Sequence, residues 1–310
     1  MVRFVVIGEG RPAKVLLDSL VETPGASIDA LVLRNPESNP LVEFAGGYDV
    51  PVFDVRSISQ EAERIAGQPG GWLINVNSTA IIPSNVLKLF DGRSLNFHPG
   101  LLPDYAGLHT HQWAIRNGER EFGVTVHRME QRIDAGAIVG QQRFPIQPDD
   151  TGLSLFSRCL SAGVDLFPRI IAQIVRGEAL SDVPQDLTRR RLYRHRDALD
   201  GRIDWNDRAD RIVDFIRAGN YEPFTSPTYV ALLDAVAGFD IEVLRATGEA
   251  TCGGDPGTII NISDRGPLVV CGDGNAIRII KARRGRQTMT FAQWGDYVCH
   301  LRDHRLRGRS

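Results

Sequence analysis

The chain is organised around residues 94–140, SLNFHPGLLPDYAGLHTHQWAIRNGEREFGVTVHRMEQRIDAGAIVG, where polar side chains gather in an otherwise apolar setting. Asn96 and His98 lie two residues apart at the end of a short apolar segment, so their side chains leave the same face of a strand. Turns at Pro99 and Pro103 follow, and a second apolar segment leads into a loop with Asp134. Because a carboxylate beside an imidazole suits proton transfer, this stretch is the candidate active site.

Apolar segments alternate with helical patterns before this stretch. The run RFVVIG is followed by a glycine turn and by apolar residues at helical spacing, and further strands are expected at 30–33, 51–54, 72–76 and 94–97. This alternation predicts an α/β fold whose mostly parallel sheet has helices on both faces. Ligands bind such sheets at the carboxyl ends of the strands, so Asn77, Thr79 and Ile81 are candidate pocket residues.

In the second half of the chain, the alternation of strands and helices gives way to a long helix, a polar segment and short strands. A long amphipathic helix is expected to begin at Asp150-Thr151, and residues 181–203 are polar, without periodicity, as in a linker. A short helix with Ile212, Phe215 and Ile216 on one face then precedes short strands broken by Gly, Asp and Pro. We therefore predict a catalytic domain at 1–180 and a small, OB-like β-barrel domain at 204–310.

Composition sets the broad class of the protein. With 310 residues, 42% hydrophobic residues, 24% charged residues and a net charge of −2, the chain is typical of a globular protein with two domains. Apolar runs stay below the ~18 residues of a membrane span, and Met1 leads directly into a strand, so a cytoplasmic protein without a membrane partner is expected. The cysteines are scattered, which predicts buried thiols and neither a disulfide framework nor a metal site. They are Cys159, Cys252, Cys271 and Cys299.

The glycine turn permits an alternative function. Residues 8–13, GEGRPA, satisfy the G-x-G-x-x-A pattern of dinucleotide-binding proteins directly after a strand. The acidic ribose-binding residue is missing, although Arg34 could meet a 2′-phosphate. We favour a tight turn before a helix and keep an NADP-binding oxidoreductase as an alternative.

The polar residues match the needs of formyl transfer to an amine. The formyl oxygen gains negative charge in the tetrahedral intermediate, and the Asn96 amide and the His98 imidazole N–H could stabilise it. The amine must also lose a proton and the leaving nitrogen must gain one, a relay suited to Asp134. A nearby Asp134 carboxylate would favour the charged form of His98.

Three motifs carry a resemblance to a known family. Residues 96–103 read NFHPGLLP, residues 123–127 read GVTVH and residues 134–136 read DAG. This pattern resembles that of the formyltransferases that use 10-formyltetrahydrofolate, over nearly the whole chain. The resemblance implies a Rossmann-like catalytic domain and direct formyl transfer, without an acyl-enzyme or a metal. It also implies that Asn96, His98 and Asp134 are catalytic.

The resemblance further implies where the folate lies. In the family it occupies the loops before the catalytic strand and around the catalytic aspartate. The corresponding residues here are Asn77, Thr79, Ile81, Leu101, Leu102, Gln131 and Ile133.

The acceptor is harder to infer because the chain resembles several subfamilies. GLHTH, at 107–111, is similar to the glycinamide ribonucleotide enzymes, WAIRNGEREFGVTVH to sugar N-formyltransferases and the methionyl-tRNA enzyme, and DGRIDW to two-domain members. The segment TRRRLYRHR, at 188–196, could steer a tRNA or a phosphorylated acceptor. A net charge of −2 and the sequence DYAGLHTHQ, in place of an RGAAP-type loop, argue against tRNA.

We therefore expect the acceptor to be a small amine, either an amino sugar on a nucleotide carrier or an amine derived from an amino acid. Methionyl-tRNA formyltransferase is the main alternative, and a formyltetrahydrofolate hydrolase is a weaker one. Tyr105, His109 and His111 are the candidate acceptor contacts, and His127 is expected to be structural. A homodimer remains open.

Overall fold

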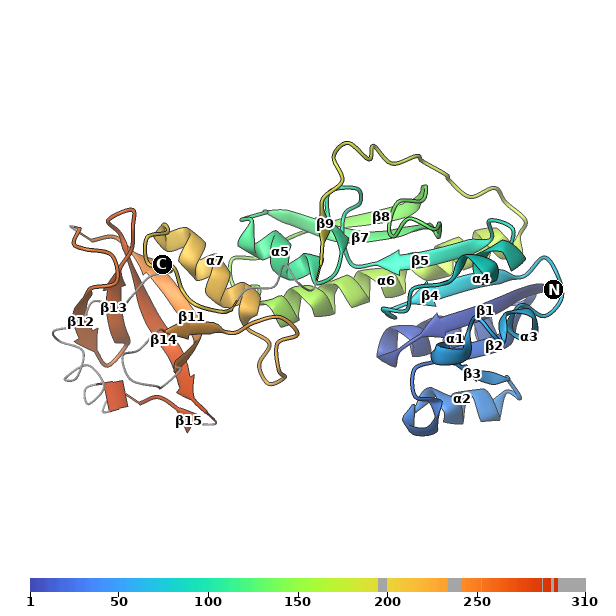
Figure 1. The fold of residues 1–310 in the computed structure, drawn as a ribbon, viewed down its shortest axis with the longest axis horizontal. Helices are drawn as coiled ribbons and strands as arrows, with labels where there is room; N and C mark the ends of the chain where they lie inside the picture. Colours follow the sequence, from blue (N-terminus) through green and yellow to red (C-terminus); the bar gives the residue numbers. More distant parts are fainter. Residues whose placement is uncertain (195–199, 234–240, 252, 286, 291–292, 295–310) are drawn as a thin grey trace. The chain divides into compact units, whose positions relative to one another are not determined.

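The computed structural model describes residues 1–310 except 195–199, 234–240, 252, 286, 291–292 and 295–310 (Figure 1). The chain forms two compact units, which are considered separately. Unit 1 comprises Met1–Gly107, Glu121–Phe144 and Ser157–Leu192, and unit 2 comprises Leu108–Arg120, Pro145–Phe156 and Tyr193–Ser310. Part of the segment expected to link two domains is thus assigned to unit 1.

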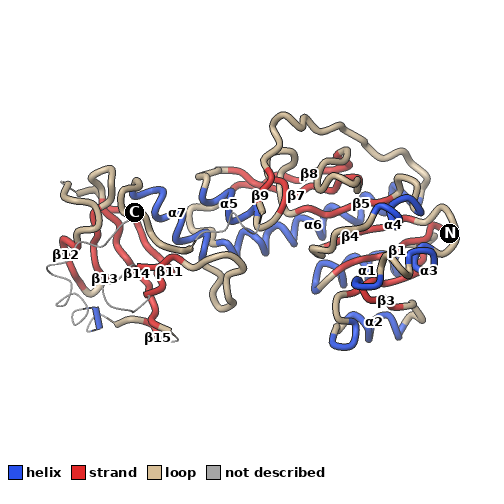
Figure 2. Tube along the Cα trace, in the orientation of Figure 1, coloured by secondary structure: helices blue, strands red, loops and turns tan. Residues whose placement is uncertain are grey.

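Unit 1 is built on a seven-stranded sheet in the order β3-β2-β1-β4-β5-β7-β8. The pairings from β3 to β5 are parallel and β5 pairs antiparallel with β7, which confirms the mostly parallel sheet. Figure 2 draws the strands of this sheet in red. The strands are β1 (Val2–Gly8), β2 (Ala26–Leu33), β3 (Val52–Asp54), β4 (Trp72–Val76), β5 (Ser94–His98), β7 (Glu121–Arg128) and β8 (Ile138–Pro145). A short pairing joins β6 (Ala106–Gly107) to β9 (Leu192–Tyr193).

Helices pack on both faces of this sheet. Side chains of α1 and α6 meet over Val76 and Phe97, whereas α3 and α4 share a buried cluster with Val5, Ile7 and Leu73 on the other face. The helices are α1 (Gly10–Glu22), α2 (Leu41–Gly47), α3 (Ala62–Ala66), α4 (Ser84–Leu89) and α6 (Gly152–Val175), with 3₁₀ turns η1 (Pro36–Ser38) and η2 (Val55–Ser57). Helix α6 begins just after Asp150-Thr151, as its sequence predicts.

The glycine pattern at 8–13 has a local structural explanation. A Cβ on Gly8 would lie 2.7 Å from the Cβ of Ala13, and Gly10 has a φ of +64°. The chain therefore needs both glycines to turn from β1 into α1. Arg34 donates to Glu9 at 3.1 Å and to the Thr79 hydroxyl at 3.0 Å, so the guanidinium considered for a 2′-phosphate is already engaged.

Among its described residues, unit 2 contains the helices α5 and α7, the start of α6 and an antiparallel sheet in the order β10-β11-β14-β13-β12, with β15 paired to β14. Its core joins α7 to the sheet through Trp205, Ile212, Ile216, Val243 and Ile277. The elements are α5 (Thr110–Arg116), α7 (Ala209–Gly219), β10 (Ala231–Leu233), β11 (Ile241–Glu249), β12 (Ile259–Ser263), β13 (Gly266–Val270), β14 (Ala276–Arg284) and β15 (Gln287–Thr288). This confirms a C-terminal β domain, while closure into an OB-like barrel stays a prediction.

The expectations for the cysteines and for membrane-spanning segments can be compared with the described residues. Cys159 and Cys271 are buried thiols, whereas Cys252 and Cys299 lie outside the described residues. In the part of the chain that the structure describes, we find no helix with the length and apolarity to span a membrane.

Candidate active site

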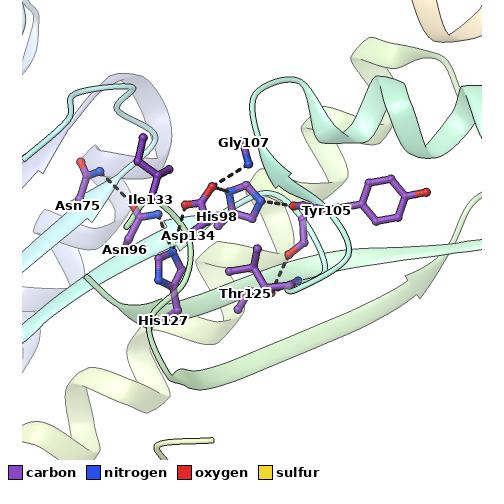
Figure 3. Close-up of polar contacts among 12 residues, drawn as sticks. Asn75, Asn96, His98, Tyr105, Gly107, Thr125, His127, Ile133 and Asp134 are labelled. Atoms are coloured by element: carbon purple, nitrogen blue, oxygen red, sulfur yellow. Dashed lines mark hydrogen bonds and ion pairs between the residues drawn. The ribbon is translucent and has the colours of Figure 1, made fainter. Parts of the chain in front are cut away.

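A row of polar side chains, of which Asn75 and His127 are buried and Asn96 is half-buried, crosses three strands of unit 1. Asn75 on β4, Asn96 on β5 and His127 on β7 occupy matching register positions. The amide of Asn75 donates to Oδ1 of Asn96 at 2.9 Å, and Nδ2 of Asn96 lies 3.0 Å from Nε2 of His127 (Figure 3). Nδ1 of His127 lies 2.7 Å from the Arg128 carbonyl oxygen. Sequence reasoning missed Asn75 because one asparagine in an apolar strand carries no pattern.

His98 lies two residues beyond Asn96 on β5, and its two ring nitrogens face different acceptors. Nε2 is 2.5 Å from the carbonyl oxygen of Tyr105, so it donates to that backbone group. Nδ1 faces Oδ2 of Asp134 at 3.6 Å, which is too long for a direct hydrogen bond. A reacting group or one water between the ring and the carboxylate would connect them.

Asp134 is held in an unusual backbone conformation in the loop between β7 and β8. Its φ is +52°, a left-handed value that costs energy for a residue other than glycine. Oδ2 accepts the Gly107 N–H at 2.8 Å, and Oδ1 lies 3.4 Å from Nε2 of His127. The structure thus brings the three predicted catalytic residues together within unit 1.

A segment that we call the strap, residues 182–192, holds this loop in place. Nε2 of Gln185 donates to the carbonyl oxygens of Asp134 and Gly136, at 3.1 and 2.6 Å. Arg190 donates to the carbonyl of Ile133 at 2.7 Å. The strap was expected to be a linker, and no local sequence signal reveals its contacts with the site.

The strap is itself anchored at both ends. Asp182 receives two hydrogen bonds from Arg128, at 2.7 and 3.0 Å. Val183 pairs with Ile138 through backbone hydrogen bonds of 2.8 and 3.0 Å, and the Arg191 carbonyl accepts from Ala106 at 3.0 Å. The strap therefore contacts both the segment after β5, at Ala106, and the loop that carries Asp134.

The electrostatics of the pair follow from its burial. Burial of the His98 imidazole lowers its pKa, although the Asp134 carboxylate and the Tyr105 carbonyl act in the opposite direction. Burial also acts to raise the pKa of Asp134, but His98, His127 and the Gly107 N–H more than offset it and hold that pKa below its usual range. The expected influence of Asp134 on His98 is present but smaller than the effect of burial. At neutral pH an ionised carboxylate therefore faces a neutral imidazole that can accept a proton.

The side chains of the proposed folate-binding residues differ in their exposure to solvent. Ile81 is 74% exposed and Ile133 is 47% exposed, and Gln131 is also exposed, so these side chains are open to a ligand. Leu101 and Leu102 are buried.

The remaining two folate candidates are engaged within their own loop and its neighbours. Nδ2 of Asn77 donates to the carbonyl of Glu9 at 3.0 Å. The hydroxyl of Thr79 accepts from Arg34. Any contact of these residues with folate would therefore involve their backbone groups more readily than their side chains.

The proposed acceptor residues fall in different units. Tyr105, in unit 1, is buried, with its ring edge-on against Phe122 at 5.5 Å. His111, in unit 2, is 3% exposed, and its Nε2 contacts the hydroxyl of Tyr221. Burial lowers the pKa of His111 to about 3.

His109 lines a solvent-open recess of about 250 Å³ in unit 2. The guanidinium of Arg116 lies 4.3 Å from the centre of the Trp113 ring, and that ring stacks on Tyr193 at 4.8 Å. Two guanidinium groups thus share the recess with aromatic rings. The lining residues are His109, Gln112, Trp113, Arg116, Arg194, Thr228 and Tyr229.

No group of three or more His, Cys, Asp or Glu side chains is arranged to hold a metal ion among the described residues.

Comparisons with known proteins converge on one family. A family model described as formyl transferase matches residues 72–171, and a model of the formyl transferase C-terminal domain matches residues 197–296. A methionyl-tRNA formyltransferase of Synechococcus sp. (strain JA-3-3Ab) is 28% identical over 249 residues, covering 77% of this chain and 74% of that protein.

Solved structures share the fold along most of the chain. An N-formyltransferase from Helicobacter canadensis, in complex with folinic acid and dTDP-3-aminofucose, aligns with a TM-score of 0.71 at 19% identity, over 90% of this chain and 99% of that one. The sugar 3N-formyl transferase WlaRD aligns with a TM-score of 0.72 at 20% identity, over 93% and 99%. HypX from Aquifex aeolicus, in complex with tetrahydrofolic acid, aligns with a TM-score of 0.59 at 20% identity, over 95% and 47%.

Proposed function

The chain belongs to the formyl transferase family, and from that premise we propose that it moves the formyl group of 10-formyltetrahydrofolate directly onto the amine of a small molecule. The observation that carries the proposal is the convergence of Asn96, His98 and Asp134 around the carboxyl end of β5 in unit 1. An amide donor, a neutral imidazole and an ionised carboxylate supply what this reaction needs.

The proposed reaction begins with attack of the amine nitrogen on the formyl carbon. As the new C–N bond forms, the formyl oxygen becomes negatively charged and accepts a hydrogen bond from Nδ2 of Asn96, and His98 becomes a second donor once its Nδ1 carries the amine proton. The amine proton passes to Nδ1 of His98, where Asp134 stabilises the imidazolium. Rupture of the bond between the formyl carbon and the folate nitrogen completes the transfer, and that nitrogen receives the proton.

The exposed side chains near the site fit a flat folate ring. Ile133 directly precedes Asp134, and Ile81 lies in the loop after β4; both present apolar surface to solvent. Solvent-exposed isoleucine side chains in such loops favour an apolar ligand ring. Folinic acid and tetrahydrofolic acid are bound in the solved complexes of structural relatives, which supports a folate donor.

The recess of unit 2 supports a phosphorylated acceptor. Arg116 and Arg194 supply cationic donors, and Trp113 and Tyr229 supply aromatic surface. Phosphate prefers guanidinium groups and a nucleobase prefers aromatic rings, so an amino sugar on a nucleotide carrier matches both. The relative bound to dTDP-3-aminofucose is consistent with this class.

Methionyl-tRNA formyltransferase is the second candidate. The curated relative from Synechococcus carries that function, and the same arginines would also suit a nucleic-acid phosphate. The two candidates share the catalytic residues and differ only in the acceptor.

The catalytic assignment is tested by replacing Asn96, His98 and Asp134 singly with alanine. Loss of one oxyanion donor is expected to lower kcat by about 10²–10³-fold, while the folate dissociation constant stays within a few-fold of wild type. Transfer is measured by loss of the formyl donor with an amine acceptor, and folate affinity by calorimetry. Asn261→Ala, at an exposed asparagine of unit 2, is the control and should keep full turnover. Near-normal turnover in all three variants would falsify the assignment.

A further inference from the structure

We infer that Asn75 is a positioning residue that sets which end of the Asn96 amide faces the formyl group, an inference that rests on the proposed function. Only the NH₂ end of a carboxamide can donate to the developing oxyanion, and the oxygen end would repel it. An asparagine in this role therefore has to be held in one of two orientations that have almost the same shape.

The direction of the hydrogen bonds along the polar row selects one orientation. The Arg128 carbonyl can only accept, so Nδ1 of His127, 2.7 Å away, carries the proton. Nδ2 of Asn96 lies 3.0 Å from Nε2 of His127, so in this arrangement the NH₂ group of Asn96 donates and Nε2 accepts. That leaves Oδ1 of Asn96 directed at β4, where Nδ2 of Asn75 donates to it at 2.9 Å.

His127 alone cannot fix the orientation of the Asn96 amide, and Asn75 supplies the second contact that does. A contact at one end permits the amide to swing about its side-chain torsions, whereas contacts at both ends fix it. One N–H of Asn96 is used by His127, and the second remains for the formyl oxygen. If Asn75 turned over, its oxygen would face Oδ1 of Asn96, and two acceptors would oppose each other.

The burial of Asn75 also points to a role beyond stability. Its side chain is 4% exposed in a strand whose other residues are apolar or aromatic. Its Oδ1 is buried and has no hydrogen-bond partner among the described residues. A buried unpaired acceptor is unfavourable, so an apolar side chain would serve the strand better. The donor end of Asn75 is what the position needs.

Two substitutions test the inference against a matched control. Asn75→Leu keeps the volume but removes the donor, and Asn75→Asp offers an acceptor that would draw the Asn96 NH₂ group away from the substrate. Because one oxyanion donor is misdirected, kcat should fall by about tenfold to a hundredfold in each variant while the KM for the formyl donor stays within about threefold. Ile74→Val, whose side chain lies on the opposite face of the same strand, should change neither.

Nitrogen NMR of the His127 ring is the second readout, since a purely structural role would leave its protonation unchanged. In Asn75→Asp the Asn96 oxygen would face Nε2 of His127, so the ring should carry a proton on Nε2 as well as on Nδ1, which still faces the Arg128 carbonyl. Wild-type kcat in Asn75→Leu, together with inactive Asn96→Ala, overturns the inference and leaves the proposed function standing. If Asn75→Asp does not fold, Asn75→Leu decides. Full turnover in Asn96→Ala would instead remove the proposed function itself.

Discussion

The side chains of His98 and His111 are both buried, but their different hydrogen-bond partners give the two rings a different ability to carry a proton. His98 has an acceptor near each ring nitrogen, the Tyr105 carbonyl and the Asp134 carboxylate, so the protonated ring would find partners for both N–H groups. Nδ1 of His111 has no hydrogen-bond partner in the described part of the chain, and its Nε2 meets only the Tyr221 hydroxyl. The first imidazole can hold a proton during a reaction, whereas the second stays neutral.

The neutral state of His111 predicts a dependence of stability on pH. Its pKa is about 3 in the folded protein against 6.5 in an unfolded chain, so the unfolded state binds more protons between these values. Stability is complete above pH 6.5 and is lost as the pH falls towards 3, by about 1.4 kcal/mol per pH unit for this group at most. His111→Gln should show a shallower loss than wild type when urea unfolding is compared at pH 7 and pH 5. Arg120→Gln, at an exposed arginine of unit 2, should keep the wild-type slope, and equal slopes in all three proteins would refute the prediction.

At the level of elements, the catalytic loop depends on a segment that has no regular structure of its own. The loop carries Asp134 at a positive φ, and Gly136 lies so close to Arg128 that a Cβ there would be 2.1 Å from its carbonyl oxygen. Strained backbone persists only where its surroundings hold it. Gln185 does so by donating to two carbonyls of the loop, and Arg190 donates to a third.

Removal of the Gln185 donor should therefore impair transfer more than stability. Gln185→Met keeps the length of the side chain but cannot donate, so the loop should relax and Asp134 should move away from His98. We expect kcat to fall by about tenfold, as for a misplaced catalytic group, with the melting temperature within a few degrees of wild type. Steady-state kinetics and thermal unfolding give the two readouts. The control is Thr188→Ala on the same strap, whose hydroxyl bonds only Asp186 among the described contacts; a loss of kcat as large in this variant would contradict the role of Gln185.

For the molecule as a whole, charge separates the two candidate acceptors. The chain has a net charge of −2, while its arginines are concentrated in particular segments such as 188–196. A small phosphorylated acceptor needs only a local cluster, but a tRNA engages many phosphates and releases many counterions. The dependence of the acceptor KM on salt therefore reports the class of acceptor.

We expect an amino sugar nucleotide to be formylated with a KM that rises only a few-fold between 50 and 200 mM salt, since few phosphates are neutralised. Arg116→Ala should raise this KM by about tenfold, as expected for loss of a charged hydrogen bond to phosphate. Arg120→Ala, at an exposed arginine of unit 2, is the control. Efficient formylation of charged initiator tRNA with a steep salt dependence would favour the second candidate, and release of formate without an acceptor would indicate a hydrolase.

Sequence patterns identified the features of this protein that depend on neighbouring residues. The apolar segment 72–76 coincides with β4, the Asp150-Thr151 signal precedes α6, and α7 buries Ile212 and Ile216 as its periodicity predicts. The N-x-H spacing places Asn96 and His98 on one face of β5, because alternation along a strand is a local property. Family motifs then added Asp134, which no periodicity would have selected.

The features that depend on contacts between distant residues emerged only from the folded chain. The alignment of Asn75, Asn96 and His127 requires a particular register among β4, β5 and β7, and that register is set by the packing of the whole sheet. The contact of Gln185 with the Asp134 loop spans 51 residues of sequence, and the burial of His111 requires Tyr221, 110 residues away. Local composition cannot encode which distant segments meet, since that choice minimises the free energy of the complete fold. The predicted catalytic residues could therefore be named from their motifs, while the side chains proposed to orient them could not.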